Sequence, residues 1–315
     1  MERGGEESDR NAQDAADRFI QAAPAKVNLS LQIIGKRRDG YHLLDSLVVF
    51  AAVGDDVLVR RAARLSLAVR GPFADSLTGQ SDNLVLRAAR LLAEVAGRAP
   101  QAAIELEKRL PVAAGIGGGS ADAAATLLAL NRLWRLDYSL ESLMDLGAAL
   151  GADVPVCLYG RPAVMRGIGE EIRPAPALPP VWLLLVNPAV GLATASVFRA
   201  RPALFSSPPR WRELDAFDSV AALADCLADA GNDLEATAAS LCPEIDEVLS
   251  ALASLSGCEL ARMSGSGATC FGLFGAAEPA QLAAAALRSI RPNWWVQATP
   301  LLTSRDSDCL SQSGR

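Results

Sequence analysis

The chain has 315 residues, of which 50% are hydrophobic and 21% charged, and its 30 basic and 36 acidic residues give a formal net charge of −6 at pH 7. This composition excludes a wholly disordered chain and a disulfide-stapled miniprotein, and it disfavours a general binder of nucleic-acid backbones, although a local basic pocket stays compatible with it. The length suffices for one large domain or two of ordinary size.

Histidine and cysteine usage limits the chemistry. His42 is the single histidine, which excludes metal sites built from several histidines. Any catalytic triad would have to use His42. We therefore expect a carboxylate or a lysine as any catalytic base. The cysteines stand at least 12 residues apart, so there is no CxxC motif and we expect six free thiols: Cys157, Cys226, Cys242, Cys258, Cys270 and Cys309.

The N-terminal segment and the hydropathy pattern predict a cytoplasmic protein without membrane or nucleic-acid partners. Residues 1–18 hold six acidic residues and three arginines and lack the apolar stretch of a signal peptide, so we expect a disordered acidic tail. The densest apolar run, residues 181–186, falls far short of the roughly 20 residues of a membrane span. It is typical of a buried strand.

The first predicted strand covers residues 26–33, where apolar and polar residues alternate strictly. This pattern indicates a half-buried strand whose polar face carries Lys26 and Asn28 side by side. A turn at residues 38–40 then leads into a second strand over residues 41–50. A solvated charge is the alternative interpretation of Lys26.

A glycine-rich segment at residues 111–122 carries the strongest functional signal. Four glycines in the five positions 115–119 lead into a predicted helix over residues 120–134, with Ser120 as its N-cap and Asp122 in its first turn. Flexible backbone beside a helix N-terminus forms a cradle for phosphate. The segment lacks the Gly-Lys-Ser/Thr of a P-loop, and Ser120 replaces the third glycine of a dinucleotide fingerprint. A glycine-rich helix entry without a ligand is the alternative.

A second helix is predicted over residues 139–150, followed by the segment Gly151-Ala152-Asp153-Val154-Pro155. Pro155 should bias Val154 toward an extended conformation. Asp153 is then either a capping residue at a helix boundary or a general base held above a substrate hydroxyl.

The segment of residues 173–180 holds four prolines and predicts a linker between two halves of the chain. A second loop is expected over residues 201–210. In the second half we expect strands at 182–186, 259–263, 269–274 and 295–298, and helices at 232–241, 244–255 and 279–290. The glycine turn at 263–269 is either an ordinary hairpin connection or a second wall of a cleft. The elements predict an α+β fold.

Together these segments resemble the GHMP kinases, which include galactokinase, homoserine kinase and mevalonate kinase. The matching motifs are, in order, residues 23–29 (APAKVNL), the glycine loop at 111–124 and the turn at 264–267 (SGSG). Residues 35–42 (GKRRDGYH) and 151–155 (GADVP) are similar in particular to the branch that acts on a methylerythritol linked to cytidine diphosphate. The resemblance covers residues 22–303, and Ile116 stands where leucine is more usual.

The resemblance implies a two-domain fold with the active site in the cleft between the domains. It places a ribosomal-protein-S5-like domain at residues 19–173, a ferredoxin-like domain at 174–303 and a flexible tail at 304–315. The implied enzyme is an ATP-dependent kinase that is a monomer or weak homodimer. It would transfer the γ-phosphoryl group to the 2-hydroxyl of the methylerythritol unit, a step of the non-mevalonate route to isoprenoid precursors.

The resemblance also implies roles for particular residues. Asp153 would accept the hydroxyl proton beside Lys26, and Mg²⁺ would bridge the ATP phosphates, with Ser120 as a possible ligand. The residues implied to hold ATP are Pro111, Val112, Ala113, Ala114, Gly115, Ile116, Gly117, Gly118, Gly119, Ser120 and Ala121. Those implied to bind the acceptor are Asn28, Tyr41, His42, Thr194, Phe198, Gly265 and Ser266.

Three alternatives stay open at this level. The chain could be another GHMP small-molecule kinase, such as a homoserine or mevalonate kinase, without a cytidine pocket. It could also be a non-catalytic metabolite-binding regulator, although such a protein would not need both Lys26 and Asp153. Finally, Tyr41 and Phe198 could be core residues, and His42 a hydrogen-bonded structural histidine.

Overall fold

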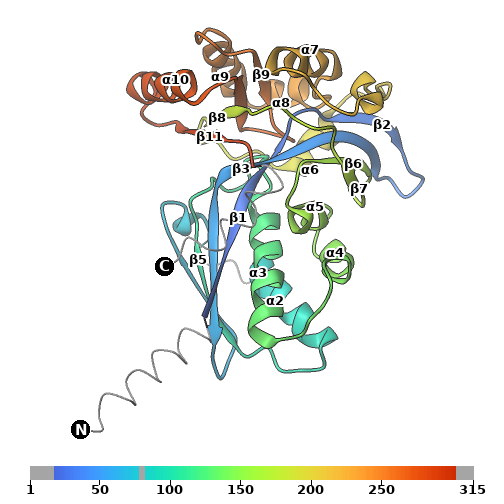
Figure 1. The fold of residues 1–315 in the computed structure, drawn as a ribbon, viewed down its shortest axis with the longest axis vertical. Helices are drawn as coiled ribbons and strands as arrows, with labels where there is room; N and C mark the ends of the chain where they lie inside the picture. Colours follow the sequence, from blue (N-terminus) through green and yellow to red (C-terminus); the bar gives the residue numbers. More distant parts are fainter. Residues whose placement is uncertain (1–17, 78–81, 303–315) are drawn as a thin grey trace.

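The computed structural model describes residues 18–77 and 82–302 (Figure 1). The predicted tails at residues 1–17 and 304–315 lie outside this range, as does Cys309. Arg18, predicted as the last residue of the acidic tail, instead begins the first strand. The other five cysteines are free thiols, as expected.

A mainly antiparallel sheet forms the first half of the described chain, in the order β4-β5-β3-β6-β7, with β1 and β2 also paired to β3. Its central strand β3 pairs with β2 and β6 through its first part and with β1 and β5 through its second part. The strands are β1 (Arg18–Asn28), β2 (Gln32–Lys36), β3 (His42–Arg61), β4 (Ser66–Arg70), β5 (Ala102–Glu107), β6 (Ala163–Gly167) and β7 (Glu171–Pro174).

Four helices pack on one face of this sheet, with α3 against β1 and β3 at the centre (Figure 1). They are α2 (Leu84–Val95), α3 (Gly118–Trp134), α4 (Leu140–Ala148) and α5 (Val154–Tyr159); a short 3₁₀ helix η1 (Ala74–Leu77) precedes them. Alternate β3 side chains divide between two cores. Val48 and Phe50 face the helices, whereas Leu47 and Val49 face the second half of the protein. Burial of both faces explains the continuous apolar run in this strand.

A four-stranded antiparallel sheet in the order β11-β8-β10-β9 forms the second half. Leu184 and Val186 of β8 face helices α9 and α10, whereas Leu183 and Leu185 face the first sheet and helix α7. The apolar run predicted as a buried strand is therefore buried on both faces. The elements are β8 (Trp182–Asn187), α6 (Thr194–Ala200), η2 (Arg210–Glu213), α7 (Val220–Ala230), α8 (Glu235–Leu241), α9 (Glu244–Ala253), β9 (Leu260–Met263), β10 (Cys270–Phe274), α10 (Ala277–Ile290) and β11 (Trp295–Pro300).

The end of the described chain returns to the first half. Leu302 N–H donates to the carbonyl of Phe50, and Leu301 forms an isolated bridge with Ala51. The proline-rich segment leaves the first sheet after Pro174 and enters the second at Trp182, as a linker would. The domain limits 19–173 and 174–303 stay a prediction, whereas the α+β architecture is confirmed.

The prediction of one half-buried strand over residues 26–33 is wrong in two respects. The strand breaks after Asn28, and the polar side chains of Lys26, Asn28, Ser30 and Gln32 are buried rather than solvated. The reason is that distant segments of both halves pack on this face: Asp153 and Gly117 lie against Lys26, and Ser46 and Gly265 lie against Asn28. The strand expected at residues 41–50 extends to Arg61.

Two local expectations around the helices are also wrong. Helix α3 begins at Gly118 behind Gly117, so Ser120 is not its N-cap and Asp122 lies beyond its first turn. Val154 is not extended but begins α5, because Pro155 falls in the first turn, where a missing N–H costs no helical hydrogen bond. The remaining predicted elements are present with boundaries shifted by a few residues; those missed include α2, β5, β6 and α7.

Candidate active site

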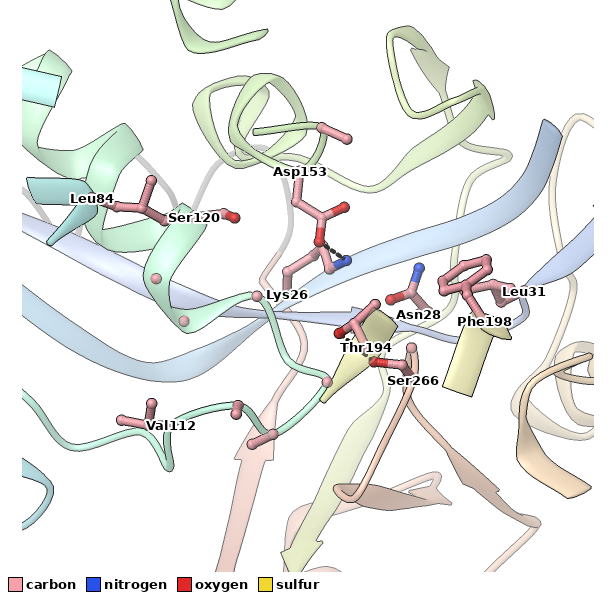
Figure 2. Close-up of a pocket in the computed structure, with 18 of the residues that line it drawn as sticks. Lys26, Asn28, Leu31, Leu84, Val112, Ser120, Asp153, Thr194, Phe198 and Ser266 are labelled. Carbon is pink, nitrogen blue, oxygen red and sulfur yellow. Dashed lines mark hydrogen bonds and ion pairs between the residues drawn. The ribbon is translucent and has the colours of Figure 1, made fainter. Parts of the chain in front are cut away.

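A cleft of about 820 Å³ lies between the two halves of the protein and collects most of the residues singled out in the sequence (Figure 2). The lysine of β1 and the aspartate before α5 stand at its centre. The glycine loop and the start of α2 line one end, and aromatic residues line the other. Of the predicted site residues, only Ile116 and Ala121 do not line the cleft; both are buried in the cores.

Lys26 and Asp153 form an ion pair, with 2.8 Å between Nζ and Oδ2 (Figure 2). A register shift in β1 at this point frees the Lys26 N–H to bond the carbonyl of Ile116 in the glycine loop. The Lys26 side chain is 5% exposed and that of Asp153 34% exposed, so the carboxylate is the partner that solvent and substrate reach. Asp153 occupies the N-cap position of α5, but among the described residues its carboxylate makes no capping hydrogen bond and binds Lys26 instead.

The glycine loop runs beneath this pair and ends in helix α3. Gly117 has φ of +63°, and a Cβ there would lie 3.1 Å from Cβ of Lys26, so glycine meets both a conformational and a steric need. The first N–H groups of α3 have no partner within the helix and carry its positive dipole end. Ser120, in this first turn, lines the cleft beside them.

The second glycine turn packs directly on the first. A Cβ on Gly115 would lie 2.5 Å from the carbonyl oxygen of Ser264, and one on Gly265 would lie 2.7 Å from the carbonyl oxygen of Gly115. The Ser264 hydroxyl donates to the Gly115 carbonyl at 3.0 Å and accepts from the Asn28 N–H at 3.1 Å. The turn at 263–269 is therefore part of the cleft wall and not an isolated hairpin connection.

The other end of the cleft carries the predicted aromatic residues. His42 and Phe198 lie with ring centroids 5.2 Å apart, and Tyr41 is 60% exposed at the rim, so Tyr41 is not a core residue. Phe198 packs partly against the core of the second half while also lining the cleft. Burial, and then the charges of Arg201 and Lys36, lower the pKa of His42 from its ordinary value of 6.5. The imidazole is therefore neutral at pH 7, with one donor and one acceptor nitrogen.

Further polar groups line the cleft beside the ion pair. Asn28 donates to the Ser46 hydroxyl at 2.8 Å, and its buried Oδ1 has no hydrogen-bond partner among the described residues. The hydroxyls of Thr194 and Ser266 are 2.8 Å apart, which joins α6 to the second glycine turn (Figure 2). Gly265 lines the cleft through its backbone, at the turn that Asn232 holds by donating to the carbonyls of Met263 and Gly265.

Two parts of the cleft were missed in the sequence. At the end lined by the glycine loop, Leu77 and Leu84 lie beside the predicted Val112 and beside Asn83, whose side chain accepts from the Val85 N–H and caps α2. An asparagine before an apolar helical run is an N-cap signature that could have located this helix. Lys108 lies beneath the glycine loop, bound to Asp55 and Asp122. No sequence spacing connects these three residues.

Burial and charge have opposite effects on the pKa values of Lys108 and Asp122. Burial raises the pKa of Asp122 to about 7, since desolvation and the nearby Asp55 outweigh the attraction of Lys108. For Lys108, burial alone would lower the pKa, but the two carboxylates raise it, so the ammonium stays charged. Over residues 18–77 and 82–302, no group of three or more His, Cys, Asp or Glu could hold a metal ion. Within the same range no helix is long and apolar enough to cross a membrane.

The chain is similar to known kinases along nearly its whole length. The GHMP kinases N terminal domain matches residues 83–161, and the GHMP kinases C terminal domain matches residues 213–292. A 4-diphosphocytidyl-2-C-methyl-D-erythritol kinase of Rhodospirillum rubrum is 53% identical over 91% of this chain and 94% of its own length. The kinase of the same name from Paramagnetospirillum magneticum is 52% identical over 90% of this chain and 99% of its own length.

Solved structures show the same likeness. A crystal structure of 4-(cytidine 5'-diphospho)-2C-methyl-D-erythritol kinase superposes with a TM-score of 0.73 at 37% identity, covering 90% of this chain and 99% of that one. A homoserine kinase from Cytophaga hutchinsonii has a TM-score of 0.71 at 19% identity, covering 91% and 95% of the two chains. At that identity the second likeness shows a shared fold alone.

Proposed function

Because this chain belongs to the GHMP kinases, and within them to the family of 4-diphosphocytidyl-2-C-methyl-D-erythritol kinases, we propose that it phosphorylates the 2-hydroxyl of 4-diphosphocytidyl-2-C-methyl-D-erythritol. The protein is an ATP-dependent small-molecule kinase. The proposed product belongs to the non-mevalonate route to isoprenoid precursors. The ion pair of Lys26 and Asp153, set between the glycine loop and the aromatic end of the cleft, carries the proposal.

Asp153 is the proposed base. Its carboxylate faces the cleft on the side away from the core, where an acceptor hydroxyl can approach Oδ1 while Oδ2 stays bound to Lys26. The neighbouring ammonium of Lys26 can orient the attacking oxygen. Phosphoryl transfer requires little covalent chemistry from the protein. The main contribution of the protein to catalysis would therefore be to hold these groups in line with the ATP phosphates.

The glycine loop and the start of α3 are the proposed phosphate site. Residues 111–115 and 117–120 line the cleft there, and the first N–H groups of the helix start would bind an anion. Mg²⁺ bound with ATP would neutralise charge on the phosphates. Since the described residues form no carboxylate metal centre, the phosphates would supply most of its ligands and the Ser120 hydroxyl the protein's share.

The aromatic end of the cleft is the proposed cytidine site. Tyr41 and Phe198 offer ring faces for a pyrimidine, and the neutral His42 can donate and accept at its edge. The unpartnered Oδ1 of Asn28 and the hydroxyls of Thr194 and Ser266 lie between this end and the ion pair, where the sugar-like part of the acceptor would rest. The cytoplasmic location and the monomer or weak homodimer stay predictions of the sequence.

A panel of acceptors tests the function. Purified protein is incubated with ATP, Mg²⁺ and 4-diphosphocytidyl-2-C-methyl-D-erythritol, homoserine or mevalonate, and phosphorylated product is measured. We expect turnover of the cytidyl compound alone. Turnover of another acceptor would retain the kinase chemistry but refute the cytidine site, and binding of ATP without any turnover would favour a regulator on this scaffold.

A further inference from the structure

Lys108, Asp55 and Asp122 form an ion cluster that is closed to solvent beneath the glycine loop. The ammonium of Lys108 lies 2.5 Å from Asp55 and 2.7 Å from Asp122. The three residues are 2%, 1% and 3% exposed, respectively. Two carboxylates therefore share one buried cation, at a position that borders the cleft through Lys108 and Asp122.

The cluster is attached to both ends of the glycine loop. Asp55, in the middle of β3, accepts from the backbone N–H groups of Arg109 and Leu110, the two residues that lead into the loop. Asp122 belongs to α3, into which the loop runs. Lys108 joins the two carboxylates, so the entrance and the exit of residues 111–117 are tied to the same strand of the sheet.

Stability alone is a weak reason for such a cluster. Removing three charged groups from water is costly, and apolar residues of similar volume often serve a core equally well. The space above the cluster is also shaped around it: a Cβ on Gly118 would lie 3.1 Å from the Lys108 ammonium. A glycine at the start of α3 thus allows the cation to sit directly under the first turn of the helix.

We propose that Asp55, Lys108 and Asp122 are positioning residues for ATP, which hold the two ends of the glycine loop at the separation that the phosphates require. None of them needs to touch the nucleotide. A loop fixed in its binding geometry before ATP arrives loses less conformational entropy on binding, and so binds more tightly. This inference rests on the proposed phosphate site.

Two variants each remove one of the two carboxylates that bind Lys108 and leave the ammonium paired with the other. Asp122→Leu keeps the branched shape of aspartate and leaves Lys108 paired with Asp55, but it releases the helix. Asp55→Asn keeps an oxygen for the N–H groups of residues 109 and 110 and leaves Lys108 paired with Asp122, but an amide NH₂ replaces the oxygen that binds Lys108, so the link between Lys108 and strand β3 is broken. Asp122→Asn is the conservative rescue, because its amide oxygen still accepts from Lys108.

Thr126→Val is the matched control on the same helix. The Thr126 hydroxyl is fully buried and donates to the backbone carbonyl of Asp122 at 2.7 Å, so its loss disturbs α3 without touching the charges. The dissociation constant of Mg·ATP is measured by calorimetry without an acceptor, together with Tm and the KM values for both substrates.

We expect Asp122→Leu to weaken Mg·ATP binding about tenfold, the size of one hydrogen bond to a charged group. Asp55→Asn should act in the same direction, and both variants should leave the KM of the acceptor unchanged. Asp122→Asn should bind close to the wild type, and Thr126→Val should lower Tm without changing ATP affinity. If Asp122→Leu fails to fold, the Mg·ATP affinity of Asp55→Asn tests the inference.

Wild-type affinity in the folded cluster variants, or an equal loss of affinity in Thr126→Val, would overturn the inference. Failure of the wild type itself to bind Mg·ATP would instead refute the proposed phosphate site, so the two failures are distinguishable.

Discussion

Replacing Asp153 by asparagine tests the role of the proposed base while it leaves the other residues of the site unchanged. The amide keeps an oxygen that can accept from Lys26, whose ammonium lies 2.8 Å from Oδ2, but it cannot take a proton from the acceptor hydroxyl. General-base catalysis contributes about 10²- to 10⁴-fold, so kcat should fall at least about 100-fold, or about 2.7 kcal/mol in the barrier.

Other properties of the Asp153→Asn protein should change little. Asp153 is 34% exposed and the asparagine oxygen can still accept from the buried Lys26, so the protein should stay folded, with a small decrease in Tm. The KM for ATP should stay within about threefold of the wild type, because the glycine loop contacts Lys26 rather than Asp153. Steady-state assays with each substrate varied, and a thermal melt, measure all three quantities.

Asp145→Asn provides the matched control, since Asp145 is an exposed aspartate on the neighbouring helix α4 and does not line the cleft. It should leave kcat and both KM values unchanged. Near-normal turnover of Asp153→Asn would refute the assignment of the base. A loss expressed mainly in the KM for ATP would mean that Asp153 serves the nucleotide and not the acceptor.

Three further perturbations test other parts of the site. Gly115→Ala should lower stability by more than about 1–2 kcal/mol and weaken ATP binding, because its Cβ would meet the backbone of Ser264 and Gly267 at a φ of +74°. Gly119→Ala is the control and should not lower Tm, because a Cβ there would meet only Leu84, at 3.5 Å. Equal Tm values for the two variants would contradict the predicted clash at Gly115. His42→Ala should raise the KM of the cytidyl substrate with little effect on ATP. Since the pKa of His42 is lowered from 6.5, the wild-type KM should be flat down to pH 6.5 and rise at lower pH as the imidazole gains a proton, a rise absent from the variant; an effect confined to ATP would refute the cytidine site. Asn83→Ala removes the cap of α2 and should cost about 1 kcal/mol in a denaturant titration, and an unchanged midpoint would show that the cap contributes nothing.

Local patterns predicted those features that depend on a few consecutive residues. Four glycines before an apolar helical run require a loop that enters a helix, and the structure has one at residues 115–118. Strict alternation from Lys26 placed Lys26 and Asn28 on one face, and both line the cleft. Ser139 was predicted at the start of a helix, and its side chain caps α4 by accepting from the Ser142 N–H.

Some local rules failed because a distant segment determines the environment. The polar face of residues 26–33 is buried because distant segments of both halves pack over it: Asp153 and Gly117 lie against Lys26, and Gly265 lies against Asn28. Helix α3 begins behind Gly117 rather than at Ser120, and position 117 needs a glycine because the Lys26 side chain occupies the space where a Cβ would lie. Neither partner is visible in the local sequence.

The sequence by itself determined the α+β class, the linker after Pro174, the glycine loop and the pair of residues proposed for catalysis. Short-range periodicity, turn chemistry and family motifs encode these features locally. Only the tertiary structure decided that the two glycine turns touch, that Asp153 reaches Lys26 across 127 positions, and that Lys108 joins Asp55 to Asp122. The physical reason is that a buried charge acquires its partner from chain topology, since the cost of desolvation is met by whichever carboxylate the packed sheet and helix bring within reach.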